Sequence, residues 1–168
     1  MDINLKTYLE KHNIQFILHI HPAFFTVSQH KELVKSNPSL NIPGLHTKNL
    51  FLKDEKNNFF LVCLPAEKIL DLKDLKEQLN IKGKLSFATS QELKDELNLT
   101  PGSVSIFAMI YAKSTTLILD KQIWESDLVG FHPNINTATL TLNHIELEKF
   151  TSSLNKKPLI LSLKNKNE

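Results

Sequence analysis

Two short segments of the sequence hold most of the side chains that could perform chemistry. Residues 43–54 read Pro-Gly-Leu-His-Thr-Lys-Asn-Leu-Phe-Leu-Lys-Asp and contain Lys48 and Asn49. Residues 131–139 read Phe-His-Pro-Asn-Ile-Asn-Thr-Ala-Thr and contain His132. A lysine fixed on a strand can hold a phosphate or polarise a carbonyl, and a histidine can orient a hydroxyl or a water molecule. Taken alone, Lys48 also fits an exposed strand lysine, and His132 fits a structural hydrogen-bonding group.

A third candidate feature is the turn at residues 100–103, which reads Thr-Pro-Gly-Ser. Gly102 allows close approach of the backbone to a ligand, and the amides of Gly102 and Ser103 are candidate donors to a developing oxyanion. A simple turn explains the same residues equally well.

The composition excludes several other kinds of site. With four glycines, the sequence has neither a dinucleotide-binding fingerprint nor a phosphate-binding loop, and it has no Gly-x-Ser-x-Gly elbow. The one cysteine, Cys63, excludes an internal disulfide and multi-cysteine metal signatures. Because its neighbours are apolar, we expect Cys63 to be a buried, inert thiol on a core strand.

The charged residues and apolar runs limit the partners. All 20 basic residues are lysines, so any phosphate contact must use lysines, amides or hydroxyls rather than a guanidinium clamp. The formal net charge of +2 argues against a constitutive nucleic-acid coat and permits a transient contact with an RNA backbone. No segment approaches the roughly 20 apolar residues of a membrane span, and the first residues do not resemble a secretory signal. We therefore expect a cytosolic protein.

The histidines allow one further site. His19 and His21 lie on the same side of a predicted strand and could bind zinc together with His46 or His132. The alternative is that they are hydrogen-bonded histidines that line a cleft or a strand end. The remaining histidines lie on predicted helices or at their caps, and we expect them to face solvent; they are His12, His30 and His144.

Hydrophobic periodicity and capping patterns predict alternating helices and strands. Helices are predicted at about residues 3–12, 26–36 and 72–79, after a capping box at residues 89–92, and after Asn143. Strands are predicted at residues 15–21, 47–53, 58–64, 84–88, 106–111, 115–119, 129–131, 137–142 and 159–163. The clearest pair is the hairpin around residues 54–57. This order predicts an α/β protein: a single domain over residues 1–168 with a mixed, partly barrel-like sheet and flanking helices.

The segment at residues 43–54 resembles the signature of the YbaK/prolyl-tRNA synthetase-associated domain family, particularly its single-domain branch that deacylates alanyl-tRNA(Pro). Residues 131–139 are similar to the C-terminal motif of that branch, and residues 21–27 resemble its early strand-to-helix junction. Residues 99–105 are similar to the loop that precedes a pocket strand. The resemblance therefore extends from about residue 14 to residue 163, which is taken as the core of a single editing domain.

The resemblance implies hydrolysis of the ester between an amino acid and the terminal adenosine of tRNA(Pro), without a metal or a nucleotide cofactor. The family's essential lysine maps to Lys48 and its late histidine to His132, which we predict to be catalytic with Gly102 and Ser103. The implied partners are the tRNA(Pro) acceptor end and prolyl-tRNA synthetase, whereas neither DNA nor a membrane is expected. Substrate contacts are predicted from Asn49, Phe24, Thr26, Val104, Ile106 and Asn136.

Two alternatives remain open. Where the family pattern has proline and glycine after residue 105, this sequence has Ile106 and then Phe107 and Ala108. A module of the same fold that binds tRNA or a synthetase without catalysis is therefore the second hypothesis. A metal hydrolase built on His19, His21 and His132 is the third.

Overall fold

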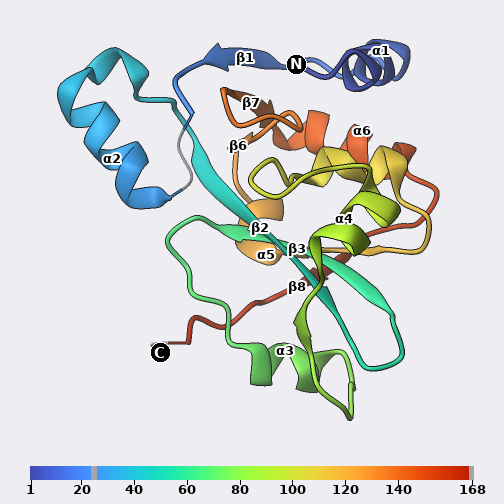
Figure 1. Cartoon of the computed structure of the whole chain (residues 1–168). Helices are drawn as coiled ribbons and strands as arrows, with labels where there is room; N and C mark the ends of the chain where they lie inside the picture. Colours follow the sequence, from blue (N-terminus) through green and yellow to red (C-terminus); the bar gives the residue numbers. More distant parts are fainter. Residues whose placement is uncertain (24–25, 167–168) are drawn as a thin grey trace.

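A computed structural model describes residues 1–23 and 26–166 of the chain. Within these residues, eight strands form a mixed sheet in the order β1-β7-β6-β2-β3-β5-β8, and β4 pairs with β2 (Figure 1). The strands are β1 (Ile17–Ile20), β2 (Leu45–Lys53), β3 (Phe59–Pro65), β4 (Ser86–Phe87), β5 (Thr116–Asp120), β6 (Leu128–Phe131), β7 (Ala138–Asn143) and β8 (Leu159–Leu161). The predicted α/β class with a mixed sheet is confirmed.

Strand β2 connects the two halves of the sheet. Its first residues, Leu45 and His46, pair in parallel with β6, and residues 47–53 pair antiparallel with β3. Its last two residues, Leu52 and Lys53, also pair with β4. The hairpin of β2 and β3 is the one predicted from the alternating apolar residues on either side of the polar turn. The segment around Lys48 therefore lies at the middle of the sheet.

Helices cover both faces of this sheet. They are α1 (Ile3–Lys11), α2 (Val27–Ser36), α3 (Leu72–Gln78), α4 (Ser90–Leu97), α5 (Lys121–Trp124) and α6 (His144–Ser153), with 3₁₀ turns η1 (Pro38–Leu40) and η2 (Ile106–Tyr111). The capping box of Thr89 and Glu92 opens α4, and the Asn143 side chain accepts from the Glu146 amide at the start of α6. Both helix starts are as predicted. None of these helices, within the part of the chain described, has the length and apolar character needed to cross a membrane.

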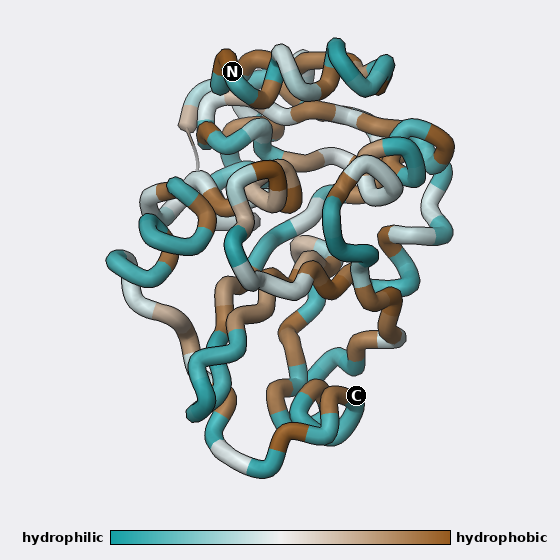
Figure 2. Tube along the Cα trace, turned by 90° about the vertical axis from the view of Figure 1, so that its right-hand side faces the viewer, coloured by the Kyte–Doolittle hydropathy of each residue, from teal (hydrophilic) through white to brown (hydrophobic). Residues whose placement is uncertain are grey.

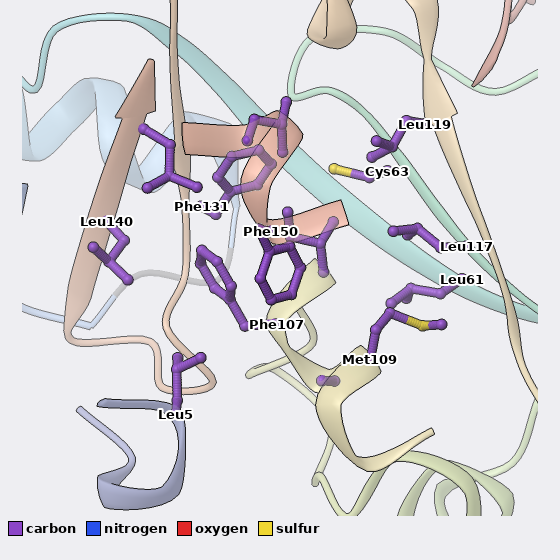
Figure 3. Close-up of a cluster of buried hydrophobic side chains, with 14 of the residues drawn as sticks. Leu5, Leu61, Cys63, Phe107, Met109, Leu117, Leu119, Phe131, Leu140 and Phe150 are labelled. Atoms are coloured by element: carbon purple, nitrogen blue, oxygen red, sulfur yellow. The ribbon is translucent and has the colours of Figure 1, made fainter. Parts of the chain in front are cut away.

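The side-chain alternation of β2 and β3 builds two apolar clusters. The larger one centres on Phe107, which makes edge contacts with Phe131 and Phe150 at ring distances of 5.7 and 5.0 Å (Figure 3). The smaller one, on the other face, contains Leu52 of β2 and Leu75 of α3. The tube after the N-terminus alternates between brown and teal, as expected for an amphipathic α1 with one buried side (Figure 2).

Two parts of the secondary-structure prediction differ from the structure. Residues 106–111 form the 3₁₀ helix η2 and not the predicted strand. The cause is local, because the Ser105 hydroxyl accepts from the Phe107 amide at 3.0 Å and so caps the start of a helical turn. The four side chains after Ser105 are all apolar and buried, so the segment lacks the alternation of buried and exposed residues that is typical of a strand. Helix α5 was not predicted, because its four residues are too few to show a helical repeat of apolar residues. The side chain of Asp120 caps its start.

Candidate active site

A cavity of about 780 Å³ opens between α2, the first half of β2, the end of β6 and the turn before η2. Among the residues that line it are Lys48, Asn49, Gly102, Val104 and His132. They come from three segments that are far apart in the sequence. The volume lies within the range of about 300–1,000 Å³ that is usual for small-molecule sites.

Lys48 lies on β2 opposite Leu64 of β3, two residues after the parallel pairing with β6 ends. The neighbouring Thr47 hydroxyl donates to the Gly130 carbonyl at 2.8 Å, which ties β2 to β6 beside the cavity. Burial lowers the pKa of the Lys48 ammonium below its usual range. Within residues 1–23 and 26–166, no carboxylate forms an ion pair with it. Lys48 therefore presents a cation that no carboxylate of the described residues neutralises.

Gly44 starts the segment that leads into β2. Its φ is +96°, and a Cβ added there would lie 2.8 Å from the Leu128 carbonyl oxygen of β6. A glycine is required at this point because both the backbone conformation and the close approach of β6 exclude a side chain. This contact sets the start of the β2–β6 pairing and, through it, the position of Lys48.

His132 follows β6, and its Nδ1 lies 3.1 Å from the Ala138 carbonyl oxygen. Since a carbonyl only accepts, Nδ1 carries the proton, and Nε2 of the neutral ring is the nitrogen with a lone pair. Burial lowers the pKa of His132, more strongly than the hydrogen bond to Ala138 raises it, and the nearby His21 and His46 lower it further. The ring is thus held neutral in a fixed tautomer.

Three more histidines stand near this cavity. His30 of α2 and His46 of β2 have ring centroids 4.7 Å apart, and both line the cavity. Nε2 of His46 lies 2.9 Å from the Ile42 carbonyl oxygen, and Nε2 of His21 lies 2.9 Å from the Thr139 hydroxyl. Burial lowers the pKa of His30, and His46, His21 and His132 contribute to the shift. The expectation that His30 faces solvent is therefore wrong.

A sequence signal could have located His30. Five residues that line the cavity repeat at a spacing of four: Thr26, His30 and Val34 form one series, and Lys31 and Lys35 form another. This spacing places them on one side of a helix that begins at the Thr26 cap, whose side chain accepts from the Gln29 amide. Figure 1 shows α2 beside the first residues of β2, which explains why its inner side meets the cavity.

The turn before η2 contributes Gly102 to the cavity wall. The φ of Gly102 is +91°, a conformation that side-chain-bearing residues rarely adopt, so the predicted glycine turn is present. The Ser103 amide donates to the Thr100 carbonyl at 3.4 Å within this turn. Ser103 does not itself line the cavity.

The predicted substrate contacts divide into three groups. Asn49, Thr26 and Val104 line the cavity. Ile106 does not, because its side chain is fully buried in the larger apolar cluster at the start of η2. Asn136 is partly exposed and is also not a lining residue, and Phe24 lies outside the described residues.

The zinc arrangement is not formed among the described residues, where no three His, Cys, Asp or Glu side chains are placed to hold a metal ion. Nε2 of His19 instead lies 3.3 Å from the Thr141 hydroxyl. Cys63 is fully buried on β3, as predicted for a cysteine on a core strand, and burial raises the pKa of its thiol.

Comparisons with known proteins agree with this architecture. The model of the aminoacyl-tRNA editing domain family matches residues 22–150. The chain is 31% identical over 162 residues to prolyl-tRNA synthetase associated domain-containing protein 1 of Danio rerio, covering 94% of this chain and 85% of that protein. It is 30% identical over 148 residues to prolyl-tRNA editing protein ProX of Acetoanaerobium sticklandii, covering 86% of this chain and 87% of ProX.

The fold has a solved counterpart. A crystal structure of a candidate trans-editing enzyme for prolyl-tRNA synthetase superposes with a TM-score of 0.71 at 18% identity, covering 98% of this chain and 99% of that one. The mixed sheet with its flanking helices is thus an editing-domain fold. The chain belongs to the aminoacyl-tRNA editing domain family, as its resemblance to the YbaK/prolyl-tRNA synthetase-associated domains predicted.

Proposed function

We propose that this protein is a trans-acting aminoacyl-tRNA deacylase that hydrolyses mischarged tRNA(Pro), with alanyl-tRNA(Pro) as its principal substrate. The observation that carries the proposal is the convergence of Lys48, His132 and Gly102 on one cavity. Membership of the editing-domain family and the likeness to ProX, a named prolyl-tRNA editing protein, support the same reaction.

Lys48 supplies the positive charge of the site. Its ammonium is half-buried, where electrostatic interactions are stronger than in water, and no carboxylate of the described residues neutralises it. It binds the terminal phosphate or polarises the ester carbonyl as negative charge develops on the oxygen. Removal of one such stabilising group typically lowers kcat by about 10²–10³.

His132 positions the attacking water. Its Nδ1–H donates to the Ala138 carbonyl, so Nε2 of the neutral ring accepts a proton as water adds to the ester carbonyl carbon. The bond between that carbon and the ribose oxygen then breaks, and the ribose oxygen takes up the proton. The products are a free amino acid and the intact tRNA 3′ end, and no covalent intermediate on the protein is required.

The turn at Gly102 supplies the oxyanion donor. Gly102 lines the cavity with its backbone, and its positive φ is compatible with the close approach of the ester. The Ser103 amide already donates to Thr100, although the distance of 3.4 Å is long, so Gly102 is the principal donor and Ser103 the second.

The tRNA acceptor end is the proposed partner, and prolyl-tRNA synthetase is the enzyme whose errors are corrected. Lys31 and Lys35 of α2 line the cavity together with Lys48, whereas Glu67 is its lining carboxylate and pairs with Lys31 at 2.8 Å. The net positive lining suits an anionic RNA backbone. A synthetase pocket for proline excludes the smaller alanine poorly, since missing methylenes contribute only about 1–3 kcal/mol of discrimination, and a second hydrolytic site corrects this.

The non-catalytic alternative rests on residues that lie outside the cavity. It was motivated by Ile106 and Ala108, which stand where the family pattern has other residues. Both are fully buried in the larger apolar cluster and do not line the cavity. The departure from the pattern therefore changes the core behind η2 and leaves the lining with Lys48 and His132 intact.

A panel of charged tRNAs tests the proposal. Purified protein is incubated with alanyl-, cysteinyl- and prolyl-tRNA(Pro), and with alanyl-tRNA(Ala), and the remaining ester is measured over time. We expect fast loss of alanyl-tRNA(Pro) and retention of prolyl-tRNA(Pro). Binding of tRNA(Pro) without hydrolysis of any ester would support the non-catalytic module instead.

A further inference from the structure

Strand β2 has an open edge between two of its neighbours. On the side away from β3, β6 pairs with Leu45 and His46, and β4 pairs with Leu52 and Lys53. Within residues 1–23 and 26–166, no strand pairs on that side with the stretch between them, whose centre is Asn49.

The hydrogen bonds at the two ends of this stretch fix the direction of its backbone groups. The Ala66 amide donates to the His46 carbonyl at 2.9 Å, on the side of β3. The Ala88 amide donates to the Phe51 carbonyl at 3.0 Å, on the side of β4. Backbone groups in a strand alternate in direction from one residue to the next. Asn49 is two residues before Phe51, so its N–H and C=O both point away from β3, on the side of the open edge.

The open edge faces the cavity. Asn49 lines the 780 Å³ cavity and also an adjoining groove of 190 Å³, and Gly102 and Val104 line both. The Oδ1 atom of Asn49 is buried and has no hydrogen-bond partner among the described residues. Asn49 therefore offers a backbone donor and a backbone acceptor at the open edge, and its side chain adds a buried acceptor, which is costly without a partner unless a ligand or water satisfies it.

We propose that Asn49 binds the aminoacyl group of the substrate as if that group were one residue of a neighbouring strand; this inference rests on the proposed deacylase function. An amino acid ester has the same sequence of nitrogen, Cα and carbonyl as a strand residue. Its α-amino group donates to the Asn49 carbonyl and to Oδ1, and its ester carbonyl accepts from the Asn49 amide. The strand edge thus recognises the part that all amino acids share.

This arrangement has a consequence for the reaction. The Asn49 amide is a further donor to the ester carbonyl, on the β2 side, in addition to the proposed donors Gly102 and Ser103 of the turn before η2. An ester that lacks the α-amino group loses the contacts to both acceptors, one of which is buried. Such an ester should be hydrolysed more slowly than alanyl-tRNA(Pro) by about 10- to 100-fold, the range expected for charge-assisted hydrogen bonds.

The test compares two esters of the same tRNA. Alanyl-tRNA(Pro) and propionyl-tRNA(Pro), in which hydrogen replaces the α-amino group, are hydrolysed by the full chain, and each rate is divided by the spontaneous rate of that ester. The variants are Asn49→Leu, which removes the side-chain acceptor at similar size, and Asn49→Asp, which keeps it. Asn155→Leu, at an exposed position outside the cavity, is the matched control.

We expect the wild type, Asn49→Asp and Asn155→Leu to prefer the alanyl ester by at least about tenfold, and Asn49→Leu to show a clearly smaller preference, because it keeps the backbone acceptor and loses Oδ1. Equal hydrolysis of the two esters by the wild type would overturn the inference and leave the deacylase function standing, and this measurement requires no variant to fold. An equal loss of both activities in Asn49→Leu would also overturn it. A wild type inactive on both esters would overturn the proposed function, and the inference with it.

Discussion

Gly44→Ala is the substitution whose effect follows most directly from the geometry. A Cβ at this position would lie 2.8 Å from the Leu128 carbonyl oxygen, and the φ of +96° is unfavourable for any residue with a side chain. The contact lies immediately before the pairing of Leu45 with Val129. The substitution therefore acts on the junction that positions β2, and not on an isolated surface turn.

Three contributions set the change in unfolding free energy that Gly44→Ala causes. A left-handed backbone conformation costs a non-glycine residue about 1–2 kcal/mol. Insertion of a methyl group against a backbone that cannot move freely costs a further ~1–3 kcal/mol. The lower entropy of alanine in the unfolded chain offsets about 0.4–1 kcal/mol. The variant should lose about 1–5 kcal/mol of unfolding free energy, and at about 2–4 °C per kcal/mol its Tm should fall by several degrees.

The assay is urea unfolding followed by circular dichroism, with deacylation measured on the same samples. Gly83→Ala is the matched control: its Cβ would lie 2.5 Å from Oε2 of Glu55, the end of an exposed side chain that can turn away, and no positive φ is involved. We expect this control to stay within about 0.5 kcal/mol of the wild type. If Gly44→Ala were as stable and as active as Gly83→Ala, the argument that Gly44 positions β2 would be refuted.

Three further predictions follow from buried groups. Lys68→Ala should cost about 3–5 kcal/mol in urea unfolding, because it leaves the buried Asp120 carboxylate without the ammonium 2.7 Å away; a loss below 1 kcal/mol would contradict this. Because burial lowers the pKa of His132 and its neutral form is the active one, kcat should fall only below about pH 6.5, whereas a fall that begins above that pH would exclude this assignment. Cys63 should resist a thiol reagent in native buffer and react fully in denaturant, since the thiol is buried and its pKa is raised; rapid native labelling would disagree with the structure.

The sequence was informative where a local pattern decides the structure. The β2–β3 hairpin follows from apolar alternation on both sides of a polar turn, and the start of α4 follows from the Thr89 capping box. Lys48, Asn49 and His132 were singled out from two short motifs, and they line one cavity. These features depend on residues that are near one another in the chain.

The features that could not be predicted depend on distant contacts. The parallel pairing of β2 with β6 joins residues that are far apart in the sequence, and it leaves the open edge at Asn49. His30 was expected in solvent because the four-residue spacing around it marks one side of α2 but does not indicate that this side borders β2. Ile106 was assigned to the pocket from its place in a motif, but the Ser105 cap turns the chain into η2 and buries the side chain in the core.

The most direct test of the central claim is the single-turnover hydrolysis of alanyl-tRNA(Pro) by the wild type and by Lys48→Met, with tRNA(Pro) binding measured in parallel. Methionine keeps the length of the side chain and removes the charge. We expect rapid hydrolysis by the wild type and a rate constant about 10²–10³ lower for the variant, with the fold retained. Hydrolysis by Lys48→Met at the wild-type rate would contradict it.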